Sequence, residues 1–409
     1  MRGFLQTACA ALLLSSGTAA SAQAGLRVDR VVMLMRHGVR PPTKAPPMPA
    51  GTAADPWPSW PVEPGYLTPH GADALRRIAA YDRAGFVRDR LLPATGCGAV
   101  RIVADSDQRT IATATVWAAA LAPGCSVDIA HRPQDVADPL FSPIGERTVP
   151  FDADKGRAAV LTAAGPGGIA AEERRLRPIL GRLDAILCGS AKTACGVTAE
   201  PSALAPAKSD AKPKLSGALD RASTVAQILL LEYADGKPMR DVGWGRATAA
   251  DIARASELHS VEFRLLARPR YVAARNVSGL GAMIGQAIAD PAPKAAAVMM
   301  ISGHDTNVAS LGGLLDLHWQ VPGLAADDPS PGGAILFERL VDDQGRRYVR
   351  AVYRSQTLDQ IRALTPLGTS AQPYRRVMPI ATCTAMGVQG LCTLAAFDAL
   401  LTERLTLSE

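Results

Sequence analysis

The feature that most constrains the fold is the apolar run Val31–Met35, which ends in a cluster of cationic residues. Five consecutive apolar residues are typical of a strand buried on both faces, as in the middle of a parallel sheet. Directly after the run come Arg36, His37, Gly38 and Arg40, and Gly38 is expected to permit a tight turn. Because ligands in open α/β sheets bind at the carboxyl ends of strands, these side chains are expected to face a crevice.

Two further buried strands are predicted, and polar residues follow each of them. Val100–Ala104 precedes Arg109 at the start of a helix, and Ala297–Ile301 precedes His304 and Asp305. Right-handed crossovers favour strands that are neighbours in one parallel sheet, and the ends of such strands meet at one edge. The sequence therefore predicts one site that combines arginines, histidines and a carboxylate.

This combination of side chains suits phosphate chemistry. Guanidinium groups match phosphate geometry and stabilise the charge on the equatorial oxygens during displacement. A neutral His37 imidazole can attack phosphorus and form a phosphohistidine, and Asp305 can protonate the leaving alkoxide. The arginines depress the pKa of His37, so an acidic pH optimum is predicted. The alternative is metal ligation by His37, His304 and Asp305, which three neighbouring arginines disfavour.

Strand–helix alternation is interrupted once along the chain. We predict an α/β domain, residues 23–151 and 268–409, with a doubly wound and largely parallel sheet. Residues 152–267 are predicted to form an inserted, smaller, all-helical domain, because apolar residues recur there at helical spacing without a convincing strand. Its expected helices are Glu172–Leu187, which Pro178 is expected to kink or break, Leu219–Ala234 and Thr248–Leu266.

The first residues predict export. Arg2, an apolar run and small residues up to Ala22 are typical of a secretory signal peptide over residues 1–22. Removal of this segment leaves six cysteines, and an even count in an exported chain suggests disulfides rather than free or metal-binding thiols. The expected pairs join sequence neighbours: Cys97–Cys125, Cys188–Cys195 and Cys383–Cys392.

Charge and hydropathy limit the partners. The formal net charge is +6, and the sequence contains no long basic run, which argues against nucleic acid as a partner. No stretch after the first residues is apolar for long enough to span a membrane. We expect a periplasmic or secreted monomer that acts on a small phosphorylated substrate. The remaining histidines are expected to be structural or at the surface: His70, His131, His259 and His318.

The motif R-H-G-x-R-x-P, present here as Arg36–Pro42, resembles that of the histidine acid phosphatase family. Similar stretches extend over nearly the whole mature chain and include ADSDQRT, GHDTNVASLGG and CTAMGVQGLC, as in the bacterial periplasmic phytase and acid phosphatase branch. The resemblance implies that His37 is the nucleophile and Asp305 the proton donor, without a metal or other cofactor. It implies that the phosphate is held by Arg36, Arg40, Arg109 and His304.

The same resemblance bears on the substrate. Thr43 and Lys44 fall where the branch lines its substrate pocket, whereas Thr224 and Gln227 stand where its phytases carry a methionine and a glutamate. The leading hypothesis is an exported acid phosphatase that prefers phytate. The alternatives are a sugar-phosphate phosphatase resembling glucose-1-phosphatases, a broad-specificity acid phosphatase, a metallophosphatase and a phosphoester-binding protein without turnover. The pairing of His37 with Asp305 disfavours the binding protein.

Overall fold

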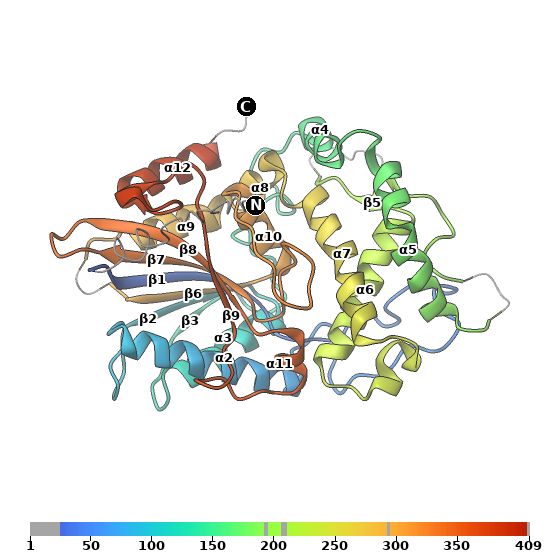
Figure 1. The fold of residues 1–409 in the computed structure, drawn as a ribbon, viewed down its shortest axis with the longest axis horizontal. Coiled ribbons are helices and arrows are strands. Elements are labelled where there is room, and N and C mark those ends of the chain that lie inside the picture. The colour runs from blue at the N-terminus through green and yellow to red at the C-terminus, as the bar shows by residue number, and fades with distance from the viewer. Residues whose placement is uncertain (1–24, 192–194, 206–210, 293–294, 407–409) are drawn as a thin grey trace, which may run out of the picture.

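The computed structural model describes residues 25–191, 195–205, 211–292 and 295–406, so the predicted signal peptide lies outside the described residues. Figure 1 shows two parts of the molecule. On the left a sheet lies between two layers of helices, and on the right lies a separate group of helices. In the sheet the strand order is β10-β8-β7-β1-β6-β2-β3, and β9 pairs with β8. Within the described residues, no helix has both the length and the apolar character needed to cross a bilayer.

The sheet has a parallel half and an antiparallel half. The parallel strands are β1 (Arg27–Arg36), β6 (Val298–Gly303), β2 (Val100–Ala104) and β3 (Ile129–Ala130). Antiparallel pairing joins β1 to β7 and adds the remaining strands: β7 (Ala334–Val341), β8 (Arg347–Ser355), β9 (Tyr374–Met378) and β10 (Cys392–Thr393). Val31–Met35 in β1 is at most 1% exposed, as expected for a central strand covered on both faces.

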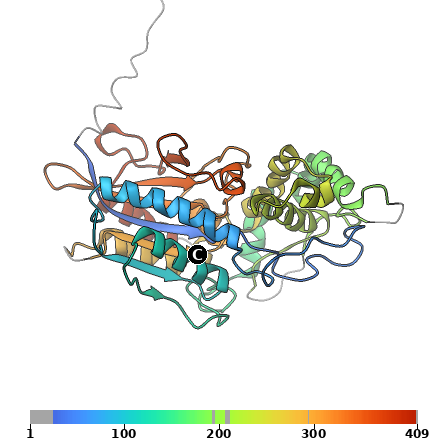
Figure 2. The same cartoon turned by 90° about the horizontal axis from the view of Figure 1, so that it is seen from below.

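Helices cover both faces of this sheet. Figures 1 and 2 show α2 (Pro69–Arg88) and α3 (Gln108–Leu121) side by side across one face. α2 begins with proline after Thr68, whose side chain accepts a hydrogen bond from the Gly71 amide at 2.9 Å. The other helices of this part are α8 (Arg270–Asn276), α9 (Ser278–Ala289), α10 (Asp305–Leu314), α11 (Leu358–Arg362) and α12 (Leu394–Thr406).

Residues 153–266 supply the second group of helices, on the right of Figure 1. Pro178 was expected to kink or break its helix, but α5 is continuous through it. Leu176, Ile179 and Leu180 beside Pro178 are buried against the other helices, which holds the helix together. The prediction missed α4 and the short pair of β4 and β5. The elements of this group are α4 (Ala153–Ala164), α5 (Gly168–Cys188), β4 (Ala203–Leu204), β5 (Leu215–Ser216), α6 (Ala218–Ala234), the 3-10 turn η1 (Met239–Gly245) and α7 (Ala249–Leu266).

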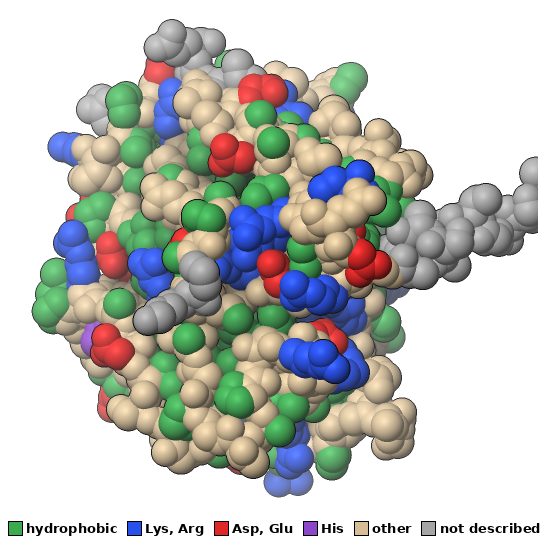
Figure 3. All heavy atoms as spheres, turned by 90° about the vertical axis from the view of Figure 1, so that its left-hand side faces the viewer, with side chains coloured by type: hydrophobic (Ala, Val, Ile, Leu, Met, Phe, Trp, Pro, Cys, Tyr) green, Lys and Arg blue, Asp and Glu red, His purple; other side chains and the backbone are tan. Residues whose placement is uncertain are grey.

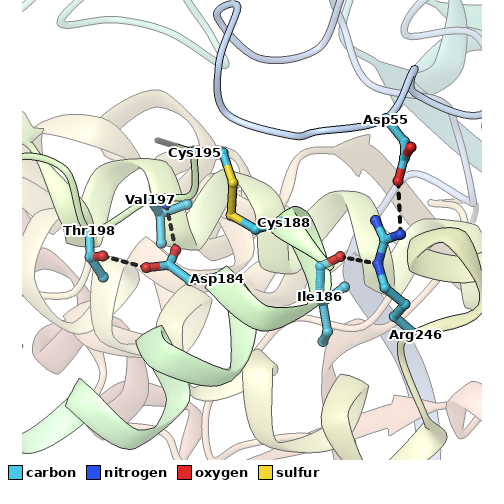
Figure 4. The surroundings of a disulfide bond; sticks show 8 residues. All are labelled: Asp55, Asp184, Ile186, Cys188, Cys195, Val197, Thr198 and Arg246. Atoms are coloured by element: carbon cyan, nitrogen blue, oxygen red, sulfur yellow. Dashed lines mark hydrogen bonds and ion pairs between the residues drawn. A yellow bond between two sulfur atoms is a disulfide. The ribbon is translucent and has the colours of Figure 1, made fainter. Parts of the chain in front are cut away.

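Disulfides and hydrogen bonds tie the loops to this framework. The structure forms the three predicted pairs, Cys97–Cys125, Cys188–Cys195 and Cys383–Cys392. Figure 4 shows the second of these at the end of α5, where Asp184 accepts hydrogen bonds from the Val197 amide, at 2.7 Å, and from the Thr198 hydroxyl. The three disulfides fit an exported protein, because such bonds persist in oxidising compartments.

The proline-rich segment, residues 41–64, runs from the end of β1 to the helical group. Arg246 donates to the Ile186 carbonyl at 2.6 Å and to Asp55 at 2.8 Å, which fastens the segment to the end of α5 (Figure 4). The Trp244 indole donates to the Pro56 carbonyl at 2.7 Å. This segment therefore joins the sheet to the helices beside the carboxyl ends of the parallel strands.

Candidate active site

The three predicted strand ends meet as neighbours. β6 lies between β1 and β2, with Arg36 in register with Gly303. Beyond the strands, the His37 amide donates to the Gly303 carbonyl at 2.9 Å, and the Asp105 amide donates to the Ser302 carbonyl at 3.0 Å. These hydrogen bonds fix the first residue after each strand. The prediction that the strands are adjacent is thus confirmed.

His37 is held as a neutral imidazole. Its residue is 1% exposed, and Nδ1 lies 2.8 Å from the Gly38 carbonyl oxygen, to which it donates. Nε2 then carries the free lone pair. Burial lowers the pKa of His37 well below its ordinary value, and the Arg109, Arg40 and Arg36 guanidiniums lower it further. The ring therefore stays unprotonated and nucleophilic in acid.

Gly38 is required for a different reason from the predicted turn. Its backbone is outside the left-handed region, but a Cβ there would lie 2.8 Å from the side chains of both Leu67 and Leu75. The Gly38 amide also donates to the Thr113 hydroxyl at 3.1 Å. Close packing of this loop against α2 and α3, rather than backbone freedom, therefore selects glycine.

The arginines have unused donors. Arg36 is fully buried, and its Nη2 donates to Gln227 Oε1 at 2.8 Å and pairs with Asp305 Oδ2 at 3.0 Å. The Nε atoms of Arg36, Arg40 and Arg109 are buried without a hydrogen-bond acceptor among the described residues. Burial and the nearby Arg109 charge lower the pKa of Arg40 to about 9. Crowded guanidiniums with orphan N–H groups are stabilised by an anion that accepts several hydrogen bonds.

His304 belongs to a network that the sequence analysis only partly identified. Its Nε2 lies 2.7 Å from Asp105 Oδ2 and 3.2 Å from Asp107 Oδ2. Burial alone lowers the pKa of His304, but these carboxylates outweigh it and raise the pKa. The ring is thus available as a cation for phosphate. Asp105 and Asp107 were not predicted as site residues, although they precede Arg109 in the same short stretch, which is the signal that could have found them.

Among the described residues, Asp105, Asp107 and His304 also form a group that could hold a metal ion. Ligand atoms of Asp105, Asp107 and His304 lie within 4.8 Å of one another. Arg109 Nη2, however, lies 2.6 Å from Asp107 Oδ2 and 3.5 Å from His304 Nδ1. A guanidinium therefore already supplies the positive charge that these carboxylates attract.

Asp305 opens α10 and is charged in the ligand-free site. The His304 amide donates to Asn307 Oδ1 at 3.0 Å, which fixes the start of the helix, and Asp305 Oδ1 accepts from the Thr306 amide at 2.8 Å. Burial by itself raises the pKa of Asp305, but the neighbouring Arg36, His259, His37 and Arg40 together outweigh burial and hold it well below its usual range. A proton donor at this position therefore requires a bound phosphate to compete for Arg36.

The predicted substrate-pocket residues lie on the exposed side of the site. Gly65 is next to both Thr43 and Arg109, since a Cβ on it would lie 3.5 Å from each. Lys44 is exposed and lines a hollow of about 500 Å³ together with Trp57. Thr224 is exposed on α6, and its hydroxyl donates to the backbone carbonyl of Asp220, one turn back in its own helix.

Opposite the strand ends, α6 and α7 contribute residues that the sequence analysis did not assign to the site. His259, expected to be structural or at the surface, has its Nδ1 2.8 Å from Gln227 Nε2 and 2.7 Å from Asp328 Oδ1. The other three histidines stay outside: His70 bonds to a backbone carbonyl of α11, His318 to Asp327 in the loop beside it, and His131 is exposed. We call Arg36, His37, Arg40, Arg109, His304 and Asp305 the strand wall, and Ser223, Gln227, His259 and Glu262 the helix wall.

A larger cavity lies at the opposite end of the sheet. It has a volume of about 1120 Å³ and contains none of the motif residues. Figure 3 shows this end of the molecule, where Lys and Arg side chains gather with acidic side chains beside them. Buried ion pairs occupy its lining, because Asp82 pairs with Arg354 at 2.6 Å and Glu338 pairs with Arg350 at 2.6 Å. Arg354 and Arg350 in this lining are therefore already paired with carboxylates.

Comparisons with known proteins agree with this geometry. A family model of the histidine phosphatase superfamily (branch 2) matches residues 27–168 and 252–354, and the chain belongs to this family. The curated protein "Phytase AppA" from Escherichia coli (strain K12) is 36% identical over 412 residues, covering 94% of this chain and 93% of that protein. A glucose-1-phosphatase from Providencia rettgeri is 26% identical over 392 residues, covering 94% of this chain and 93% of that protein.

A solved structure gives the same result for the fold. Hafnia alvei phytase in complex with tartrate has a TM-score of 0.86 and 34% sequence identity, and the match covers 94% of this chain and 98% of that chain. The predicted family, fold class and phosphatase activity are therefore confirmed. The chain is a hydrolase of the histidine phosphatase superfamily.

Proposed function

We propose that the strand wall hydrolyses phosphomonoesters through a phosphohistidine on His37, with Asp305 as the proton donor. One observation carries this assignment: an imidazole with a free Nε2 lies among three guanidiniums whose buried Nε atoms have no acceptor. A tetrahedral phosphate monoester supplies those acceptors and offers its phosphorus to the imidazole. In this role Arg36, Arg40, Arg109 and His304 bind the phosphate oxygens.

In the first step His37 Nε2 attacks phosphorus as the ester P–O bond breaks. The electron pair of that bond goes to the leaving alkoxide, which takes a proton from Asp305. The guanidiniums stabilise the charge on the equatorial oxygens, and such preorganised groups typically supply a large part of the rate enhancement.

In the second step a water molecule attacks the phosphohistidine. The Asp305 carboxylate takes the proton from this water, the P–N bond breaks, and its electron pair returns to Nε2. Phosphate leaves, and both side chains regain their starting states. One carboxyl group therefore serves as acid in the first step and as base in the second.

The acidic optimum follows from the source of the Asp305 proton. The ligand-free carboxyl is ionised beside Arg36. A phosphate that engages Arg36 weakens this ion pair, and a second pKa of phosphate near 6 means that monoanionic esters prevail in acid and bring a proton into the site. His37 stays neutral there because burial and the arginines depress its pKa.

We propose phytate as the preferred substrate in acid, with simpler sugar phosphates as the alternative. Support comes from the relatives, which include phytases and a glucose-1-phosphatase. It also comes from the exposed Lys44 beside the site, which suits a second phosphate. We further propose that residues 152–267 act as an inserted domain on one side of the crevice, and that the mature chain is a periplasmic or secreted monomer.

The covalent step is tested by rapid acid-free quenching with a ³²P-labelled monoester. Wild type is expected to accumulate label that is stable in alkali and labile in acid, as phosphohistidine is. His37→Ala is expected to trap none and to lose turnover by about 10⁴-fold or more. Absence of the label in wild type at every quench time would refute the assignment of His37.

A substrate panel tests the rest of the proposal. Phosphate release from phytate and from glucose 1-phosphate is measured between pH 3 and 8 with excess chelator present. The expected result is full activity in chelator, with phytate preferred at the acid end of this range. Loss of activity in chelator would favour a metallophosphatase, and tight ester binding without turnover would favour a binding protein.

A further inference from the structure

The helix wall is built from matched pairs of side chains. On α6, Ser223 and Gln227 are one turn apart, and on α7, His259 and Glu262 are nearly one turn apart. Ser223 donates its hydroxyl hydrogen to Glu262 Oε2, and Gln227 Nε2 lies 2.8 Å from His259 Nδ1. Gln227 in turn accepts from Arg36, which pairs with Asp305. The pairs therefore extend from the strand wall outward along the two helices.

Glu262 is the outer member of this series, about 5 Å along α7 from His259. Ser223 is fully buried, whereas Glu262 is partly exposed. One carboxyl oxygen is satisfied by Ser223, and no described residue donates to the other oxygen. Asp305 is among the charged groups that act on the Glu262 carboxyl. The free acceptor of Glu262 therefore lies on the side of the site where Asp305 protonates the alcohol of a bound ester.

The charges around Glu262 are unfavourable for a second phosphate. The groups that act on it are Asp220 on α6, Asp305 on α10 and His259 on its own helix, while Ser223 faces it as a neutral donor. No lysine or arginine is among the charged groups that act most strongly on its carboxyl. A phosphate on the neighbouring carbon of the alcohol would approach carboxylates there, whereas a hydroxyl would find an acceptor.

We propose that Glu262 is a specificity-determining residue that favours a free hydroxyl over a phosphate on the carbon next to the scissile ester. This inference rests on the proposed function and concerns the substrate class of the same site. Glu262 then selects sugar monophosphates and partly dephosphorylated inositols, and it opposes fully phosphorylated ones to the extent that its carboxyl is ionised.

The selection should depend on pH. Burial raises the pKa of Glu262, with His259 and Ser223 opposing that effect and Asp220 and Asp305 adding to it. In strong acid the carboxyl is neutral and tolerates a neighbouring phosphate. As pH rises the carboxylate forms, and repulsion between it and that phosphate grows. Phytate turnover is therefore confined to lower pH than sugar-phosphate turnover.

The test compares Glu262→Gln with wild type, using kcat/KM for phytate and for glucose 1-phosphate between pH 3 and 7. The variant is expected to raise the ratio of phytate to glucose 1-phosphate by about tenfold at pH 6 to 7, and to leave it unchanged at pH 3. Titration of the substrates cancels, because both enzymes meet the same substrates at each pH. A ratio that is equal in the two enzymes throughout would overturn the proposal.

Hydroxyl recognition is measured separately with glucose 1-phosphate and 2-deoxyglucose 1-phosphate. Wild type is expected to prefer the former several-fold, and Glu262→Gln to lose most of this preference. Ser223→Ala is a second variant, which keeps the Glu262 carboxylate but removes the hydrogen bond that orients it. It should weaken the preference for the hydroxyl, whereas the pH dependence of the ratio of phytate to glucose 1-phosphate turnover should persist. Equal rates of wild type on both sugars would contradict the proposal.

The matched control is Glu257→Gln, five residues earlier on α7, where the carboxylate pairs with Arg175 at the surface. In this variant the ratio of kcat/KM for phytate to kcat/KM for glucose 1-phosphate should equal that of wild type at every pH. Failure of the proposed function has a different signature, since an enzyme without phosphohistidine chemistry would turn over neither substrate. The outcome for Glu262 can therefore be distinguished from the outcome for His37.

Discussion

Carboxyl groups on the two sides of the crevice have opposite pKa shifts. On the strand side, the pKa of Asp107 is lowered chiefly by its hydrogen bond with His304, and that of Asp305 is lowered because Arg36 and the other cationic neighbours together outweigh burial. On α6 and α7, the pKa of Glu232 is raised to about 7 and that of Glu262 is also raised, with burial as the largest cause.

The difference teaches that burial has the same sign everywhere and that nearby guanidiniums decide the outcome. Burial always disfavours the charged carboxylate. Beside Arg36 and Arg109 this effect is reversed, so the strand wall keeps its charges in acid. No guanidinium is among the groups that act most strongly on Glu232 or Glu262, so burial keeps the pKa of both carboxyls above the ordinary value. One side is thus suited to hold a phosphate dianion, and the other to respond to pH.

The largest expected effect tests the strand side of this comparison. Asp305→Asn removes the proton donor and should lower kcat for glucose 1-phosphate by about 10² to 10⁴-fold. With p-nitrophenyl phosphate the loss should be far smaller, because that leaving group needs no proton. Steady-state kinetics on both esters give the answer. Asp316→Asn, exposed just beyond α10, is the control, and equal losses on the two esters would rule out a proton-donating role.

The second prediction tests the opposite shift on α6. Glu232 has a folded-state pKa of about 7 against an ordinary value of 4.5, and its carboxylate accepts from the Gly243 amide at 3.0 Å. Because the unfolded chain releases this proton first, the contribution is present below pH 4.5 and is lost as pH rises through 7. Glu232→Gln keeps an acceptor without the charge. It should therefore be more stable than wild type at pH 8, by up to about 3 kcal/mol, and equal at pH 4.

Urea unfolding at several pH values measures this effect. The exposed residue Glu63 provides the control variant, Glu63→Gln, whose stability difference from wild type should not change with pH. A constant difference between Glu232→Gln and wild type from pH 4 to 8 would mean that Glu232 does not titrate in this range.

The two walls also differ in how far the sequence predicts them. Each cluster of the strand wall is contiguous with the strand that carries it, as His37 is with Val31–Met35, and parallel strands bring such ends together. The helix wall has no local signature. Ser223 and Glu262 are 39 residues apart and meet only through the register between α6 and α7. That register depends on tertiary packing, so His259 looked like a structural histidine.

The same limit applies to parts of the fold. β1 and β6 were predicted because buried parallel strands are continuous apolar runs, and β2 because only Arg101 interrupts its run. β9 is largely exposed and β10 has two residues, so neither has such a run. Pro178 was expected to disturb α5, but the packing of its apolar neighbours outweighs the local cost. Strong local patterns thus predict the site-bearing half of the sheet, whereas β9 and β10 depend on tertiary contacts.

A third prediction concerns the positioning of His304 within the strand wall. Asp105→Asn removes the carboxylate 2.7 Å from Nε2 and leaves Asp107 at 3.2 Å. The pKa of His304 should fall, so the ring loses its charge at lower pH and binds phosphate more weakly. The inhibition constant of inorganic phosphate should rise by about tenfold near pH 6 and by less near pH 4.

Inhibition by phosphate across this pH range is compared with that of Asp89→Asn, a variant at the far end of α2. A uniform rise at every pH would mean that Asp105 acts on the fold of the loop rather than on the charge of His304. The pH dependence is therefore the informative readout.

The smallest expected effect is at the exposed rim between the two walls. Lys44→Ala should raise KM for phytate by about two- to fivefold and leave KM for glucose 1-phosphate unchanged, because a solvent-exposed cation contributes little and only a polyphosphate reaches it. The effect should shrink as salt is added, since the Debye length falls to about 3 Å at 1 M. Lys155→Ala, also exposed but on α4, is the control. If Lys44→Ala changed KM equally for both substrates, Lys44 would be supporting the loop and not selecting the substrate. Discrimination between phytate and sugar phosphates would then depend on the helix wall alone.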